Sequence, residues 1–166
     1  MKRAWPPSVL LAALLLGLSV ACGGDPGGVA PVPDEASGPE RLGREIGETY
    51  LLLLDDARAM LDLNLPAEQM RLALRLLRDD YRVRFANLGC LRQDMGASDQ
   101  AEVERLADDY VNINGGQDST WLSQGTQRYS ADPEVPTLLT EIQGLRIYAF
   151  FDQLARTRPG EHILCD

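Results

Sequence analysis

The sequence is poor in the residues on which many catalytic and metal sites depend. Its 166 residues include one histidine, His162, and three cysteines. A single histidine excludes a multi-histidine metal site and leaves few ways to build a histidine-based catalytic centre. The Gly-x-Ser-x-Gly motif of nucleophilic hydrolases does not occur. We therefore expect a protein without enzymatic activity, without a metal site and without a cofactor.

Positive charge is also scarce. Acidic residues outnumber basic residues by 25 to 16, which gives a net charge of −9. Lys2 is the one lysine, so nearly all the positive charge is carried by arginine. Nucleic-acid binding depends on clustered positive charge that neutralises phosphates. The composition therefore predicts a protein that does not bind nucleic acid.

The first residues have the layout of an export signal. Lys2 and Arg3 precede a leucine-rich apolar run at 9–21. This run is too short to span a bilayer comfortably, and small residues stand at its end. We therefore expect residues 1–21 to be a signal peptide that is removed, which would bring the net charge from −9 to −11.

Residues 18–22, Leu-Ser-Val-Ala-Cys, resemble the lipobox of bacterial lipoproteins. The resemblance implies cleavage before Cys22, diacylglycerol on its thiol, acyl chains such as palmitate, and attachment of the protein to a lipid bilayer. Ser19 stands where leucine is usual, and the small residues Ser19 and Ala21 also suit ordinary signal peptidase. Two glycines rather than an aspartate follow Cys22, which in lipoproteins of diderm bacteria favours the outer membrane, facing the periplasm or the cell surface.

A tether follows the lipidated residue. Half of the residues at 23–40 are glycine or proline, and large apolar side chains are nearly absent. Such a segment cannot bury a core, so residues 22–40 are predicted to form a flexible tether.

With lipid on Cys22, Cys90 and Cys165 remain as two thiols in an oxidising compartment and can pair as a disulfide. The alternative is that both thiols are buried, separate and inert.

From residue 41 the apolar residues repeat with the period of an α-helix. The periodicity predicts four helices: 41–63, 66–88, a third that opens at Ser98 or Asp99 and ends before Gly115, and a fourth that opens near Asp132 or Pro136 and ends before Pro159. No run of alternating apolar and polar residues favours a strand. The predicted fold is therefore all-α, a small four-helix bundle over residues 41–166.

Single residues indicate where these helices begin and end. Pro66 suits the first turn of the second helix, and Gly89 is expected to stop that helix. Asp99 and Glu102 have the spacing of a capping box for the third.

The predicted second helix carries a row of arginines. Four of them follow i, i+4, i+7, i+11 spacing and share one helix face: Arg71, Arg75, Arg78 and Arg82. One interpretation is a solvated face with ion pairs to neighbouring acidic helices. The other is a docking stripe for an acidic partner or for anionic lipid headgroups, since guanidinium groups bind carboxylates and phosphates through paired hydrogen bonds.

A long segment at 115–132 carries Trp121 and Tyr129 among glutamines. Long loops are often functional, and an aromatic ring beside amides can stack on a sugar while binding its hydroxyls. This favours a glycan contact at Trp121 and Tyr129. The alternative is that Trp121 lies in a short helical turn that closes one end of the bundle.

Two classes of function follow. The leading hypothesis is a membrane-anchored envelope lipoprotein that acts as a non-enzymatic binding or assembly module, with an envelope protein as partner. The alternative is a module that binds glycan or peptidoglycan, or a weak hydrolase built on two carboxylates. A bundle whose core admits a lipid is a third possibility.

Overall fold

The computed structural model describes residues 37–115 and 119–165. The predicted signal peptide and Cys22 lie outside these ranges, as does the tether up to residue 36. Within them, every regular element is a helix and no strand occurs, which confirms the all-α fold. No described helix combines the length and the apolar character that a membrane crossing requires.

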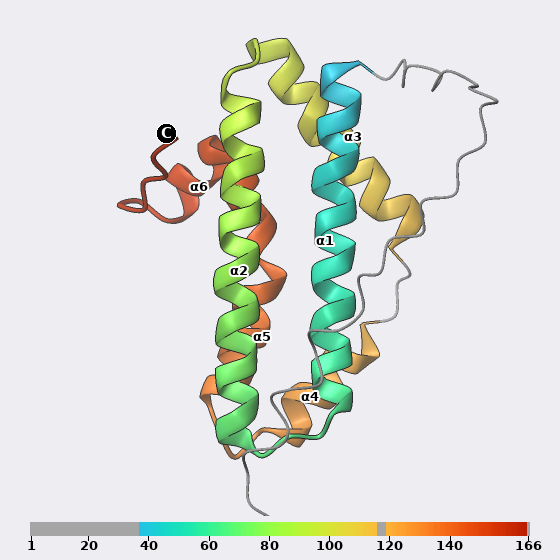
Figure 1. Cartoon of the computed structure of the whole chain (residues 1–166), viewed down its shortest axis with the longest axis vertical. Coiled ribbons are helices and arrows are strands. Elements are labelled where there is room, and N and C mark those ends of the chain that lie inside the picture. Colours follow the sequence, from blue (N-terminus) through green and yellow to red (C-terminus); the bar gives the residue numbers. More distant parts are fainter. Residues whose placement is uncertain (1–36, 116–118, 166) are drawn as a thin grey trace, which may run out of the picture. The chain divides into compact units, whose positions relative to one another are not determined.

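Two long helices form an antiparallel pair, α1 (Gly38–Asp62) and α2 (Ala67–Gln93), which lie side by side in Figure 1. The side-chain oxygen of Ser37 accepts a hydrogen bond from the backbone N–H of Glu40, which caps the start of α1. Residues 38–40, predicted as tether, are therefore the first turn of this helix. Asn64, at φ 51°, turns the chain toward α2; asparagine tolerates this left-handed conformation.

The third helix, α3 (Ala97–Asn114), packs along α1. Two glycines of α1 allow the close approach: a Cβ on Gly43 would lie 2.7 Å from the Cβ of Leu106, and one on Gly47 would lie 2.8 Å from the Cδ1 of Tyr110. The predicted capping box at Asp99 does not form, because α3 begins earlier, at Ala97, with Gly96 at its N-cap. The helix boundary therefore differs from the prediction by one turn or less.

The segment predicted as a loop at 115–132 contains a helix, α4 (Thr120–Arg128). The predicted fourth helix is instead three pieces, α5 (Glu134–Gln143), the 3-10 helix η1 (Leu145–Ala149) and α6 (Phe151–Thr157). The break has a packing cause. Tyr148, Ala149 and Phe150 are all buried, and one continuous α-helix would turn at least one of three adjacent residues away from the core.

The core lies where α5 and η1 cover α2 and where α1 meets both. Its largest fully buried side chains come from α1, α2, α5, η1, α6 and the residue between η1 and α6: Ile46, Leu53, Met70, Leu74, Tyr81, Phe85, Leu139, Ile142, Leu145, Tyr148, Phe150 and Leu154. In Figure 1 α5 lies behind α2, so that the pair α1 and α2 forms one broad face of the domain.

Gly89 does not end α2, which continues to Gln93. It faces η1 and α6 instead, where a Cβ would lie 2.6 Å from the ring of Phe151 and 2.7 Å from the backbone oxygen of Tyr148. A glycine at this position lets η1 and α6 pack close to α2, because it has no side chain. It does not end the helix.

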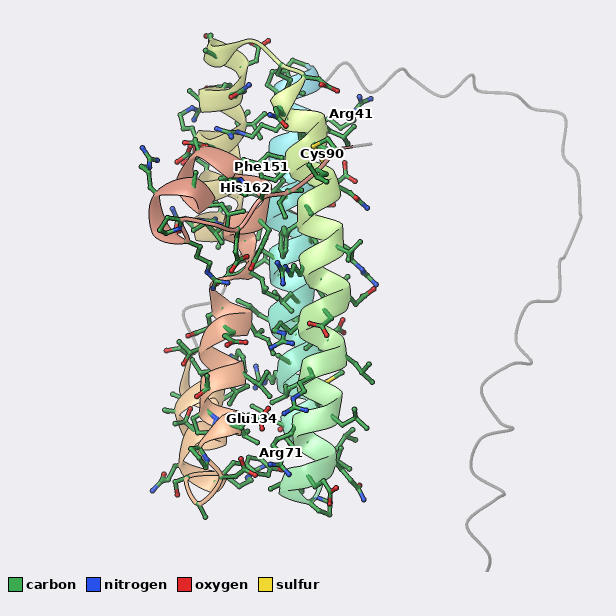
Figure 2. The ribbon with its side chains drawn as sticks, turned by 90° about the vertical axis from the view of Figure 1, so that its left-hand side faces the viewer. Arg41, Arg71, Cys90, Glu134, Phe151 and His162 are labelled. Carbon is green, nitrogen blue, oxygen red and sulfur yellow. A yellow bond between two sulfur atoms is a disulfide. The ribbon has the colours of Figure 1, made fainter. Side chains whose placement is uncertain are left out.

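Cys90 and Cys165 form a disulfide, which confirms the predicted pairing and fixes the C-terminal tail to α2 (Figure 2). Close to this bond lies Arg92, the one buried charged residue in the described part of the chain. Its guanidinium donates to the Oδ1 of Asp152 at 3.0 Å and to the backbone oxygen of Gln100 at 3.1 Å. Arg92 thereby joins the end of α2 to α3 and α6.

Candidate functional site

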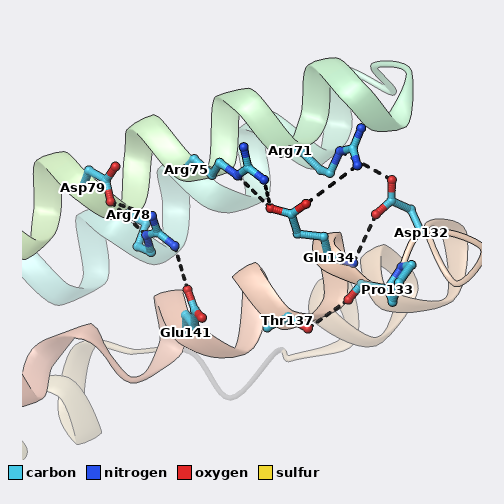
Figure 3. A network of polar contacts seen from close by, with 9 residues as sticks. All are labelled: Arg71, Arg75, Arg78, Asp79, Asp132, Pro133, Glu134, Thr137 and Glu141. Carbon is cyan, nitrogen blue, oxygen red and sulfur yellow. Dashed lines mark hydrogen bonds and ion pairs between the residues drawn. The ribbon is translucent and has the colours of Figure 1, made fainter. Parts of the chain in front are cut away.

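The four arginines predicted as a docking stripe face α5 and the C-terminal tail, and each is engaged within the chain. Arg71 forms ion pairs with Asp132 and Glu134, and the guanidinium of Arg75 donates two hydrogen bonds to Glu134 (Figure 3). Arg78 donates to Glu141 at 2.9 Å. This hydrogen bond, with Asp79 beside it, raises the pKa of Arg78 above its ordinary value.

Arg82 extends the same row to the tail. Its guanidinium donates to Glu161 at 3.2 Å and lies 4.7 Å from the ring centroid of Tyr148. The hydroxyl of Tyr148 donates to Glu161 at 2.6 Å, and Arg158 donates to the oxygen of that hydroxyl at 2.8 Å. The hydrogen bond from Tyr148, together with Arg82 and Arg158, lowers the pKa of Glu161. We call this row, Arg71 to Arg82 with its acidic partners, the arginine face.

A second region is hollowed and lies between α1, α3 and the segment from α5 to η1. Two adjacent hollows, of about 600 and 440 Å³, share four lining residues: Tyr50, Val111, Asn112 and Gln143. Volumes of this size are typical of sites for small ligands. We call the two hollows together the Tyr50 groove.

Aromatic side chains line both parts of the groove. Phe150 lies in the larger hollow and Trp121 in the smaller one, with Tyr50 between them as a shared residue. The hydroxyl of Tyr50 donates to the backbone oxygen of Gln143 at 3.2 Å, and burial raises the pKa of Tyr50. Tyr50 therefore joins α1 to the end of α5 as a neutral phenol.

The polar side chains of the groove differ in their engagement. Arg146 pairs with Asp108 at 2.6 Å and lies 5.4 Å from the ring centroid of Tyr50. In contrast, the side-chain amides of Asn112 and Gln143 have no hydrogen-bond partner among the residues that the structure describes. Both residues are exposed and line both hollows. Their donors and acceptors are therefore available to a bound molecule.

The structure separates the two aromatic residues predicted to bind a ligand together. Trp121, in α4, is half-buried, packs against the core and lines the smaller hollow. Tyr129 is 7% exposed, and its hydroxyl donates to the backbone oxygen of Leu65 at 2.7 Å. Tyr129 belongs to the core and does not line the groove, because its ring closes the junction between the α1–α2 turn and α4.

Sequence reasoning did not identify Tyr50, Asn112 or Gln143 as a site. They come from three different helices, α1, α3 and α5. Each residue type is ordinary at its position in a helix, so none of the three indicates a function by itself. Their proximity depends on the break after α5, which places Gln143 at a helix end beside Tyr50. No local motif marks such a meeting of three helices.

Histidine, cysteine and carboxylate side chains do not gather into a group of three or more that could hold a metal within residues 37–115 and 119–165. His162 is exposed on the tail (Figure 2).

Comparison with protein-family models, with curated proteins and with solved structures yields no match for this chain. Function is therefore inferred from the chemistry of its own side chains.

Proposed function

We propose that this chain is a lipid-anchored, non-enzymatic binding module of the bacterial cell envelope, and that its ligand binds in the Tyr50 groove. The anchor rests on the export-type leader and on the lipobox-like residues 18–22. The binding role rests on one observation above all: beside two hollows of ligand size, the side-chain amides of Asn112 and Gln143 have no partner within residues 37–115 and 119–165.

The groove supports this role better than the arginine face does. The guanidinium groups of the arginine face already bind Asp132, Glu134, Glu141 and Glu161. An acidic partner would have to displace these intrachain carboxylates before it could bind, so most of the interaction energy would be spent on the exchange. The side-chain amides of Asn112 and Gln143 can bind a ligand without first losing a partner in the described part of the chain.

The anchor is tested by fractionating cells that express the full-length chain or its Cys22→Ser variant. We expect the parent in the membrane fraction with a mature N-terminus at Cys22, and the variant either unprocessed or released. A processed Cys22→Ser protein that stays with the membrane would contradict the lipid anchor.

The binding role is tested by cross-linking in the cell, with mass spectrometry of the captured material. We expect capture by the full-length chain and loss of capture in Asn112→Ala/Gln143→Ala. The matched control is Asn87→Ala/Gln69→Ala, which replaces the same two residue types at exposed positions of α2. Capture unchanged by the groove variant, or no capture at all, would refute the proposed binding site.

Docking through the arginine face is the second candidate, and half-exposed Arg75 favours it. Simple charge reversal would break the pair that each arginine makes. The exchange Arg78→Glu with Glu141→Arg keeps opposite charges across the same contact and inverts their positions. If a protein partner docks on the arginine face, the exchanged variant loses capture, whereas a groove ligand is retained.

A further inference from the structure

We infer that the ligand of the Tyr50 groove is a neutral oligosaccharide. This inference rests on the proposed function and adds the chemical class of the ligand. It is carried by three features of the groove: its aromatic rings, its unpaired amides and its balanced charge.

The aromatic rings provide surfaces on which sugar rings can stack. Tyr50 and Trp121 are both half-buried, so each ring is held by the domain while part of its surface lines the groove. A pyranose ring presents apolar C–H groups on its face and hydroxyls around its edge. An aromatic ring that is fixed on one side and open on the other suits that face, because stacking buries apolar surface without displacing the hydroxyls.

The unpaired amides suit the edge of a sugar. Each side-chain amide of Asn112 and Gln143 offers two N–H donors and a carbonyl acceptor. A sugar hydroxyl also donates and accepts, so a pair of hydroxyls can bind one amide through both of its groups. Because Asn112 and Gln143 line both hollows, they lie where a chain of sugar units would pass from one hollow to the other.

The charges in the groove cancel, although the whole chain is strongly acidic. The lining includes two acidic residues, Asp55 and Asp108, and two basic residues, Arg58 and Arg146. Arg146 is paired with Asp108. A surface of balanced charge provides no net attraction for a polyanion or a polycation. The ligand that fits is therefore uncharged and rich in hydroxyls.

A peptide fits the groove less well. Extended peptides bind strongly where a sheet edge offers unpaired backbone groups, and the described part of the chain has no sheet. Helical peptides need a long apolar groove, whereas this lining mixes amides and charged groups with its apolar residues.

The test is calorimetric titration of the full-length chain with neutral hexasaccharides of glucose, linked α1,4 or β1,4, and of N-acetylglucosamine. The chain is kept in a detergent whose headgroup is not a sugar, so that detergent does not occupy the groove. Hexalysine, a sulfated polysaccharide and a proline-rich peptide serve as probes of the other ligand classes. We expect binding of at least one neutral hexasaccharide, with an affinity that does not change between low and high salt.

The matched variants assign the binding to the groove. We expect Asn112→Ala/Gln143→Ala to weaken hexasaccharide affinity by at least about tenfold, since two hydrogen-bonding side chains are lost. Asn87→Ala/Gln69→Ala is expected to bind as the parent does. Urea unfolding of each variant shows whether it remains folded. In the chain that begins at Cys22, Trp121 is the one tryptophan, so a sugar stacked on it shifts the emission.

The outcomes separate this inference from the proposed function. If none of the neutral hexasaccharides binds while cross-linking still captures a molecule that depends on Asn112 and Gln143, the sugar class is wrong and the binding role stands. Binding of a peptide or a charged polymer at the groove in place of sugar would also overturn the inference. Loss of both sugar binding and groove-dependent capture would refute both proposals. Release of shortened sugars during titration would overturn the non-enzymatic part of the proposed function.

Discussion

The arginine face and the Tyr50 groove are both rich in polar side chains, but they use them differently. On the arginine face, charged groups of α2 bind carboxylates from α5 and the tail, up to 79 residues away in sequence. In the groove, the amides of Asn112 and Gln143 are unpaired within the described residues. The difference indicates that the two regions have different roles. Polar groups satisfied within the chain hold elements together, and polar groups left open are available for recognition.

This comparison predicts that stability and ligand affinity depend on different residues. Substitutions on the arginine face or at its supporting contacts should lower the free energy of unfolding and leave ligand affinity unchanged. Substitutions in the groove should lower ligand affinity and leave the free energy of unfolding nearly unchanged.

The largest effect is expected from removing the disulfide, with Cys90→Ser/Cys165→Ser. The bond links residues 75 apart in sequence, and loop-closure entropy for such a separation amounts to about 4 kcal/mol. Urea unfolding should show a loss of up to this size, and reductant should lower the stability of the parent in the same direction. If groove affinity fell along with stability under native conditions, the two regions would not be independent.

The second test concerns the packing beneath the arginine face, through Gly89→Ala. The added methyl group would overlap the ring of Phe151 and the backbone oxygen of Tyr148, which cannot move without shifting η1. We expect a destabilisation of roughly 2 kcal/mol, typical of overpacking. Gly38→Ala is the control, because the nearest atom from another part of the fold, the Cε of Met95, would lie 3.9 Å from a Cβ there. Equal stability of the two variants in urea unfolding would disprove the close contact.

The third test compares the two regions directly, through Glu134→Gln and Gln143→Ala. The first change removes the shared carboxylate of Arg71 and Arg75, which are partly exposed, so the expected cost is only about 0.5 to 1 kcal/mol. The second removes an amide that has no partner among the described residues and should alter stability by less than about 0.5 kcal/mol. Thermal and urea unfolding measured side by side decide the order, and the reverse order would contradict the comparison.

The smallest effect is a pH dependence at the end of the arginine face. The pKa of Glu161 is lowered from its ordinary value of 4.5 by the Tyr148 hydroxyl and two arginines. A carboxyl with a lowered pKa in the folded state stabilises the fold above pH 4.5, and that contribution is lost as the pH falls through the lowered value. The stability difference between the parent and Glu161→Gln should therefore be present at pH 7 and shrink as the pH falls below 4.5 and through the lowered pKa. A difference that grows in acid would reverse the assignment.

The sequence was a good guide to the helices and a poor guide to how they meet. Apolar periodicity predicted α1 and α2 closely, because each has a long buried stripe such as Met70, Leu74, Leu77 and Tyr81. It did not predict the break into α5, η1 and α6, which depends on burying Tyr148, Ala149 and Phe150 together. Gly89 was predicted to end α2 because the sequence does not show which segment packs against it. A glycine that ends a helix and one that admits a neighbour look alike until the neighbour is placed.

The candidate site was predictable only in part. Trp121 was identified from its polar neighbours, and it lines the groove. Tyr129, chosen with it, lies at the other end of α4, with seven residues between the two, and has a core position. The arginines were found from their spacing, but their carboxylate partners lie near residues 132–161, far outside any local pattern. Asn112 and Gln143 carried no signal, because exposed amides are ordinary on helices.

The disulfide has a consequence for how the chain responds to proteolysis. Because it joins Cys90 to Cys165, the backbone between them is a covalent ring that holds α3, α4, α5, η1 and α6. A single cut anywhere in that ring leaves both pieces attached to each other, and through α2 and α1 to whatever holds the N-terminus. The nicked molecule keeps both pieces joined until the bond is reduced, so proteolytic damage would shed no fragment and would release none on a gel without reductant.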